Sequence, residues 1–187
     1  MIKIPLNVPN ILTFFRFLLI IPTVILMLSE LWYLALICFI ISCITDLLDG
    51  VIARKYNQIS EAGMLLDPLA DKLMAVSVTV VFAMREILPD WMYIAIFIKE
   101  GLMIAGGIVL YARKLVFPAN RFGKYTAFIY NISLGLSFLH KFVDPWHKYL
   151  VGATLALMAI AFLQYLYYNW YKGYILKKRN SERGKRN

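Results

Sequence analysis

DLLDGVIARKYNQISEAGMLLDPLADK, residues 46–72, places four aspartates inside a chain that is otherwise strongly apolar. Asp46 and Asp49 follow one long apolar block, and Asp67 and Asp71 open the next. Isolated carboxylates are costly at membrane depth, so four of them at one level require a compensating partner. The segment therefore predicts a polar site where two apolar helices meet a membrane surface.

Helical periodicity gathers the first two aspartates with small residues. Residues three and four apart share one face of a helix, so Asp46, Asp49, Gly50 and Ala53 form a single stripe if the helix continues through Arg54. The two small residues leave room for a nucleotide to pack against the backbone. Arg54 would then clamp a phosphate oxygen with its guanidinium.

The second pair of aspartates forms a stripe of its own. Asp67 and Asp71 lie one turn apart, and Gly63 joins them if the helix begins early enough. Pro68 fits the first turn of a helix, so the start of this helix stays open. A loop of about ten residues would join the two helices as an antiparallel pair whose stripes face each other.

Facing carboxylates repel one another unless cations lie between them. Hard oxygen ligands suit Mg²⁺, Mn²⁺ or Ca²⁺. Two divalent ions would balance four carboxylates formally and still offer open positions to a pyrophosphate. The pattern thus predicts a two-metal site that acts on a phosphate-containing substrate.

The composition indicates an integral membrane protein. The chain has 187 residues, 61% of them hydrophobic, and a mean hydropathy of +0.67, which is more apolar side chain than a soluble domain of this size buries. Crossing a bilayer takes about 20 apolar residues. Six blocks fit that length, the fifth being short with a start that extends back to Phe122: Ile11–Leu28, Leu31–Leu48, Leu65–Met84, Trp91–Leu110, Tyr125–Leu139 and Tyr149–Tyr168. We expect an all-α protein with six transmembrane helices after a short interfacial segment, Met1–Asn10.

The positive charge predicts orientation rather than nucleic-acid binding. The formal net charge is +9, but the basic residues lie between and after the apolar blocks, where they set topology and meet anionic lipid. With the N-terminus in the cytoplasm, fourteen cations face inward and three, Arg85, Lys141 and Lys148, face outward. This bias predicts a cell-membrane protein whose site faces the cytoplasm. Residues 1–171 would form one domain, and residues 172–187 a loosely ordered basic cytoplasmic tail.

The aspartate segment resembles the signature of a known family. It matches D-x2-D-G-x2-A-R-x8-G-x3-D-x3-D at every fixed position, and this pattern is similar to that of the CDP-alcohol phosphotransferases. The resemblance implies a six-helix membrane domain, a homodimer, and two Mg²⁺ or Mn²⁺ ions. It implies that the first three aspartates ligate metal and that the fourth is a ligand or the general base. It also implies that Gly50 and Ala53 line the CDP site, with Arg54 at the diphosphate.

Two further segments resemble one branch of this family. VPNILTFFR (Val8–Arg16) and LDPLADK (Leu66–Lys72) are similar to segments of phosphatidylglycerophosphate synthases and eukaryotic-type cardiolipin synthases. Asn10 and Thr13 are accordingly assigned to CDP binding with Gly63, although both could instead cap a helix. Arg16 and Lys99 either belong to the site or serve as snorkelling cations that pair with Glu100.

The resemblance implies transfer of a phosphatidyl group from CDP-diacylglycerol to sn-glycerol 3-phosphate, with release of CMP. Cardiolipin synthesis from phosphatidylglycerol is the alternative. A dianionic acceptor needs fixed cations, and Arg113, Arg121 and Lys124 lie within twelve residues; membrane anchoring is the other interpretation of these three. A cation transporter with an acidic path is disfavoured, because the aspartates lie at one end of the crossings and the motif has no inverted copy.

Overall fold

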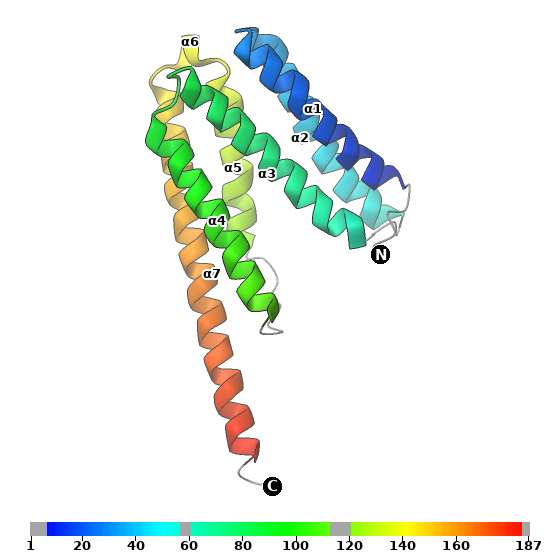
Figure 1. Cartoon of the computed structure of the whole chain (residues 1–187), viewed down its shortest axis with the longest axis vertical. Coiled ribbons are helices and arrows are strands. Elements are labelled where there is room, and N and C mark those ends of the chain that lie inside the picture. Colours follow the sequence, from blue (N-terminus) through cyan, green and yellow to red (C-terminus); the bar gives the residue numbers. More distant parts are fainter. Residues whose placement is uncertain (1–6, 57–60, 113–120, 185–187) are drawn as a thin grey trace.

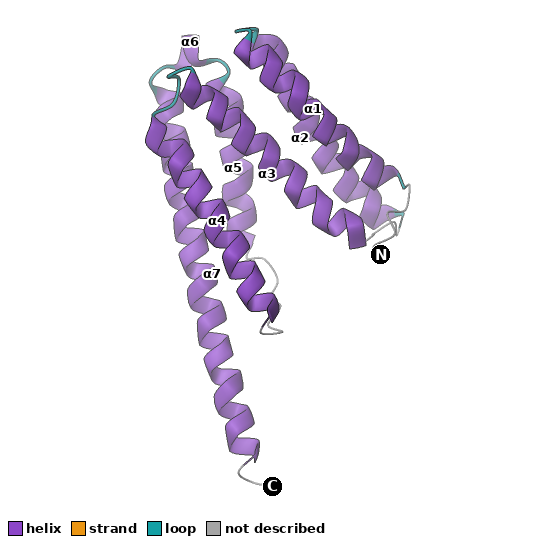
Figure 2. Ribbon diagram, in the orientation of Figure 1, coloured by secondary structure: helices purple, strands orange, loops and turns teal. Residues whose placement is uncertain are grey.

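A computed structural model shows the protein as a bundle of helices. It describes residues 7–56, 61–112 and 121–184, and within these ranges it contains helices and no strand. The helices are α1 (Val8–Leu28), α2 (Trp32–Lys55), α3 (Glu61–Met84), α4 (Asp90–Ala112), α5 (Arg121–Ser137), α6 (His140–Val143) and α7 (Trp146–Gly184). α1 and α2 lie on one side, α4, α5 and α7 lie on the other, and α3 connects the two groups (Figures 1 and 2).

Helix α1 has the polarity of a membrane helix, with polar groups inward and apolar groups outward. Its buried residues recur every three or four positions and include Asn10, Thr13, Arg16 and Thr23. Its exposed side consists of large apolar side chains: Ile11, Phe14, Phe15, Leu18, Ile21 and Ile25. Soluble monomers rarely expose such a large apolar surface to water, whereas a helix in a bilayer exposes apolar side chains to lipid.

Three helices of the described ranges are long and apolar enough to cross a bilayer. They span Val8–Leu28, Trp32–Ala53 and Trp146–Gln164. Two of the other long helices carry charges in their middle, Asp67, Asp71 and Lys72 in α3 and Lys99 and Glu100 in α4. α5 has only 17 residues. The structure therefore establishes an all-helical protein with three apolar spans, while six crossings stay a prediction.

The predicted apolar blocks coincide with the six long helices, but several ends differ. α1 begins at Val8, after Asn7, whose side-chain oxygen accepts a hydrogen bond from the Asn10 amide at 3.1 Å; the last part of the expected interfacial segment is therefore helical. Residues 1–6 lie outside the described residues. α5 begins at Arg121, in agreement with its extended start. α6 was not predicted.

The basic tail is helical from Lys172 to Gly184, where a loosely ordered segment was expected. α7 continues without interruption to Gly184. Lys, Arg, Leu and Glu all have high helix propensity, so a segment that follows an established helix extends it at little cost because no new nucleus is needed. The expectation of a loosely ordered tail did not allow for this extension of α7.

An aromatic cluster holds the centre of the bundle together. Phe82 of α3 and Phe138, just after α5, are fully buried and meet edge to face with ring centroids 4.9 Å apart. Phe39 of α2 lies 5.4 Å from Phe138, and Trp32 stacks on Phe82. Each such aromatic pair contributes about 0.5–1.5 kcal/mol beyond its buried area. The cluster thus anchors α3, which carries two of the aspartates, against α2 and α5.

Candidate functional site

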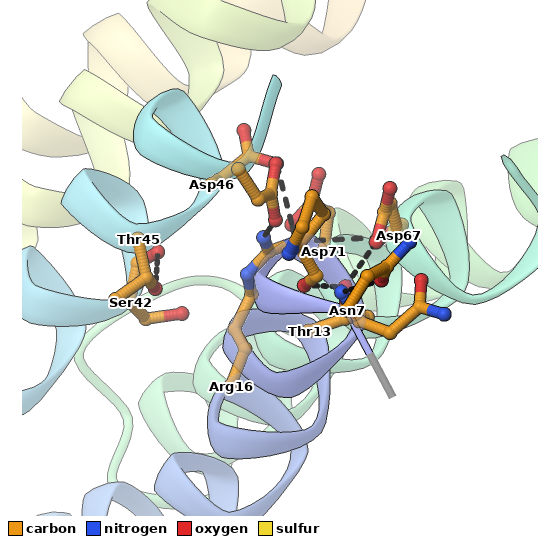
Figure 3. A network of polar contacts seen from close by, with 11 residues as sticks. Asn7, Thr13, Arg16, Ser42, Thr45, Asp46, Asp67 and Asp71 are labelled. Carbon is orange, nitrogen blue, oxygen red and sulfur yellow. Dashed lines mark hydrogen bonds and ion pairs between the residues drawn. The ribbon is translucent and has the colours of Figure 1, made fainter. Parts of the chain in front are cut away.

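Arg16 lies at the centre of the aspartate cluster. Its side chain is 1% exposed, and its guanidinium pairs with carboxylates from two other helices. Nη1 lies 3.1 Å from Asp46 Oδ1 and also contacts Asp71, while Nη2 pairs with Asp49. Figure 3 shows Arg16 rising from α1 toward Asp46 and Asp71. One guanidinium therefore joins the carboxylates that the sequence placed on facing stripes.

The two stripes meet around Arg16, because Asp46 of α2 and Asp71 of α3 both contact its Nη1. α1 packs against both α2 and α3, whereas α2 and α3 contact each other over a much shorter stretch. α3 also begins at Glu61, so Pro68 lies inside the helix rather than in its first turn, and the connection from Lys55 is shorter than the predicted ten residues. Helix extension through Arg54 is confirmed.

Asp67 is held by a different residue of α1. The Thr13 hydroxyl contacts Asp67 Oδ1 and lies 3.0 Å from the Pro9 carbonyl oxygen. Thr13 is 1% exposed, inside α1, so it does not cap the helix; Asn7 has that role. Asn10 is buried one turn earlier on the same face. The polar face of α1 thus supplies both a hydroxyl and a cation to the four aspartates.

The carboxylates fit a divalent metal in the chemistry of their oxygen atoms. Asp46, Asp49 and Asp71 all reach one guanidinium, and Asp67 lies beside them through Thr13. Oxygen donors of this kind suit Mg²⁺ or Mn²⁺. Within the described ranges, however, no group of three or more His, Cys, Asp or Glu side chains is arranged around a metal position. The side chains are arranged around Arg16 instead.

The small residues of the signature lie next to these carboxylates in the sequence and on the same helices. Gly50 and Ala53 are half-buried on α2, and Gly63 is buried near the start of α3. Arg54 lies in α2, but its side chain is outside the described part of the structure. The predicted contacts of these four residues with CDP stay predictions.

The side chains of the predicted acceptor residues lie outside the part of the chain that the structure describes. Arg113 lies between α4 and α5, beyond the described ranges, while Arg121 and Lys124 lie in α5 without a described side chain. A cavity of about 180 Å³ lined by Glu30, Trp32, Phe138 and Lys141, among others, belongs to the other end of the helices, where α1 turns into α2. It is not part of the aspartate site.

A second charged cluster lies directly beside the first. Lys72 follows Asp71 on α3, and its Nζ lies 2.9 Å from Glu100 Oε2 on α4. Lys99 pairs with the other oxygen of Glu100, as the sequence had suggested for that cation. Two lysines therefore share one carboxylate, and the bridge ties α3 to α4 at the level of the aspartates.

Glu100→Gln is expected to loosen this connection. The amide cannot neutralise either lysine, and we expect a loss of about 1–2 kcal/mol in the free energy of unfolding, because the lysines are partly exposed and can reorient. Thermal unfolding in detergent measures the change. Glu86→Gln, in the turn between α3 and α4, is the matched control, and an equal loss in both variants would contradict a role for the bridge.

Sequence reasoning left open whether Arg16 belongs to the site or is a snorkelling cation. The spacing of Arg16 pointed to the site. Arg16 follows Asn10 and Thr13 at intervals of three residues, so it shares a helix face with the two residues already assigned to CDP binding. A buried arginine needs a carboxylate partner, and the four clustered aspartates are the obvious partners that the sequence offers. Only the packing of α1 against both α2 and α3 made that partnership evident.

Comparison with known proteins adds the family. The model of the CDP-alcohol phosphatidyltransferase family matches residues 6–167. A probable phosphatidylglycerophosphate synthase of Mycobacterium tuberculosis is 34% identical over 165 residues, covering 84% of this chain and 75% of that protein. A CDP-diacylglycerol–glycerol-3-phosphate 3-phosphatidyltransferase of Rickettsia prowazekii is 32% identical, with 73% and 77% covered. A putative cardiolipin synthase of Mycobacterium bovis is 31% identical, with 87% and 78% covered.

The family model runs from residue 6 to residue 167, so it includes the four aspartates and all of α1 to α5. Proteins of this family are generally dependent on divalent metal, which agrees with the oxygen-donor set of the four aspartates. The chain therefore belongs to the CDP-alcohol phosphatidyltransferase family and is a membrane transferase of phospholipid synthesis.

Proposed function

We propose that the protein transfers a phosphatidyl group from CDP-diacylglycerol to sn-glycerol 3-phosphate, giving phosphatidylglycerophosphate and CMP. The observation that carries the proposal is the convergence of Asp46, Asp49 and Asp71 on one buried point beside Asp67. Relatives named for this reaction support the acceptor. Cardiolipin synthesis is the second candidate, because a relative named for it covers as much of the chain.

The roles of the residues follow from their chemistry. Asp46, Asp49 and Asp67 would hold the metal, which would supply positive charge to the diphosphate and to the departing phosphate oxygen. Asp71 takes the proton of the acceptor hydroxyl. The acceptor oxygen then forms a bond to the β-phosphorus, and the bond from that phosphorus to the bridging oxygen breaks, so that CMP leaves with the bonding electrons.

The apolar surroundings position the lipid substrate. Large apolar side chains cover the outer face of α1, so the acyl tails of CDP-diacylglycerol stay in the bilayer while its head group reaches the aspartates from the side. Gly50 and Ala53 would line the cytidine diphosphate, with Asn10, Thr13, Gly63 and Arg54 around it. We further propose six crossings, a cell-membrane location and a homodimer.

A screen of acceptors tests the assignment. Purified protein is incubated with CDP-diacylglycerol and Mg²⁺, and radiolabelled glycerol 3-phosphate and phosphatidylglycerol are offered separately. Labelled phosphatidylglycerophosphate is the expected product. Cardiolipin as the main product would transfer the assignment to the alternative, and absence of any CMP release would contradict the proposed reaction itself.

The proposed orientation predicts one-sided labelling. Tyr56 and Ser29 are exposed residues at opposite ends of the α1–α2 pair. Each is changed to cysteine in a background in which Cys38 and Cys43 are alanine, and vesicles of known sidedness are treated with a membrane-impermeant maleimide. Cysteine at 56 should react only from the cytoplasmic side, because positively charged segments stay there, and cysteine at 29 only from outside. The reverse pattern would overturn the orientation.

A further inference from the structure

Arg16 occupies the point at which the carboxylates of α2 and α3 converge. We propose that Arg16 is the internal counter-cation of this cluster and exchanges its carboxylate partners for the diphosphate of the nucleotide substrate once divalent metal binds. This role makes Arg16 a substrate-binding residue. The inference rests on the proposed function, since it requires a nucleotide diphosphate as ligand.

Charge balance supplies the first argument. Four aspartates, counted as ionised, and one guanidinium carry a formal charge of −3. The Arg16 side chain at their centre is almost completely shielded from water. Two divalent ions would turn this deficit into an excess of one positive charge. Unbalanced charge is costly in the enclosed part of the site, where the Arg16 and Asp49 side chains are 1% and 4% exposed, so the metal-loaded site favours an additional anion. The diphosphate of a CDP-alcohol is the anion that the reaction brings.

The surroundings of Arg16 supply the second argument. The side chain is 1% exposed and leaves α1 on the face opposite to its apolar surface, so a displaced guanidinium stays on the side of the carboxylates, two of which, Asp46 and Asp71, are 39% and 36% exposed. An anion that enters through this partly open side meets the guanidinium directly. A planar guanidinium matches a phosphate as well as it matches a carboxylate.

An unused donor supplies the third argument. Arg16 Nε is buried and has no hydrogen-bond partner among the described residues, although both Nη atoms are paired. Buried N–H groups rarely go without an acceptor. The guanidinium therefore retains one N–H group that the carboxylates do not bind. This group can donate a hydrogen bond to a phosphate oxygen.

The binding of CDP and of cytidine separates this role from a structural one. Wild-type protein, Arg16→Met and Arg16→Lys are titrated with each ligand in the presence of Mn²⁺ by calorimetry. Loss of a charged hydrogen bond should weaken CDP binding by about 10- to 150-fold in Arg16→Met and less in Arg16→Lys, which keeps the charge. Cytidine lacks the diphosphate, so its affinity should not change. Arg85→Met, which alters an arginine paired with Glu30 at the other end of α1, is the control.

Chemical modification of the wild-type protein tests the exchange without a variant. An arginine-specific dicarbonyl reagent is applied in chelator, with Mn²⁺, and with Mn²⁺ and CDP, and modification of Arg16 is quantified by mass spectrometry. We expect low reactivity in chelator, higher reactivity with Mn²⁺, and protection when CDP is added. This measurement decides the matter if Arg16→Met does not fold.

The outcomes separate the inference from the function on which it rests. If wild-type protein binds no CDP in the presence of Mn²⁺, the proposed function fails. If wild-type protein binds CDP but Arg16→Met binds it equally well, Arg16 does not contact the diphosphate and the inference is overturned. Equal modification of Arg16 under all three conditions would likewise overturn the exchange.

Discussion

Asp49→Asn should abolish turnover. Asp49 is 3% exposed and pairs with Arg16, so it lies at the most enclosed part of the carboxylate cluster. An amide is a poor ligand for a hard divalent cation, and loss of several kcal/mol of charge stabilisation corresponds to a decrease in kcat of about a thousandfold or more. Release of labelled CMP from CDP-diacylglycerol in saturating Mg²⁺ measures the effect. Asp46→Asn and Asp67→Asn should behave in the same way.

Removal of metal should have the same consequence in the wild-type protein. Activity should vanish in EDTA and return on addition of excess Mg²⁺ or Mn²⁺. Asp90→Asn is the matched control for the aspartate variants, because Asp90 is an exposed carboxylate in the first turn of α4, far from the cluster in the fold. Full activity in chelator would refute metal dependence, and normal turnover by a folded Asp49→Asn protein would remove that residue from the site.

Arg121→Ala should raise the KM for glycerol 3-phosphate far more than the KM for CDP-diacylglycerol. Glycerol 3-phosphate carries about two negative charges at pH 7, as phosphate monoesters do, and such a dianion needs fixed cationic donors. Arg121 is the first residue of α5, the helix whose Tyr130 hydroxyl lies 2.8 Å from the Thr79 hydroxyl of α3. Arg113 and Lys124 are close to Arg121 in the sequence. Losing one charged hydrogen bond costs about 1.5–3 kcal/mol, or about 10- to 150-fold in affinity.

The control for this pocket is a cation at the other end of the bundle. Lys141→Ala removes an exposed lysine in α6 and should leave both KM values unchanged. Initial rates at varied concentrations of each substrate separate the two constants. If Arg113→Ala, Arg121→Ala and Lys124→Ala all keep the wild-type KM for glycerol 3-phosphate, the acceptor pocket lies elsewhere. Phosphatidylglycerol would then be the better acceptor candidate.

The sequence alone determined the helices and the chemistry of the carboxylates. Helix formation depends on hydrogen bonds between residues four apart and on local propensity, so apolar blocks located α1 to α5 and α7 to within a few residues at most ends. Helix ends stayed open or were wrong where local signals conflicted. Pro68 left the start of α3 open, and the proline is accommodated inside a helix that begins at Glu61. The charged composition of the tail concealed the continuation of α7 to Gly184.

Only the tertiary structure decided what balances the aspartates. Arg16 pairs with residues 33 and 55 positions away, and Thr13 with one 54 positions away. No local rule specifies such partners, because they depend on which helix faces pack together. α1 packs against both α2 and α3 and brings its polar face to both pairs of carboxylates. The sequence thus determined that the four carboxylates need a cation, and the packing of α1 decided that this cation is Arg16, since buried charges pair with whatever the surrounding helices bring within reach.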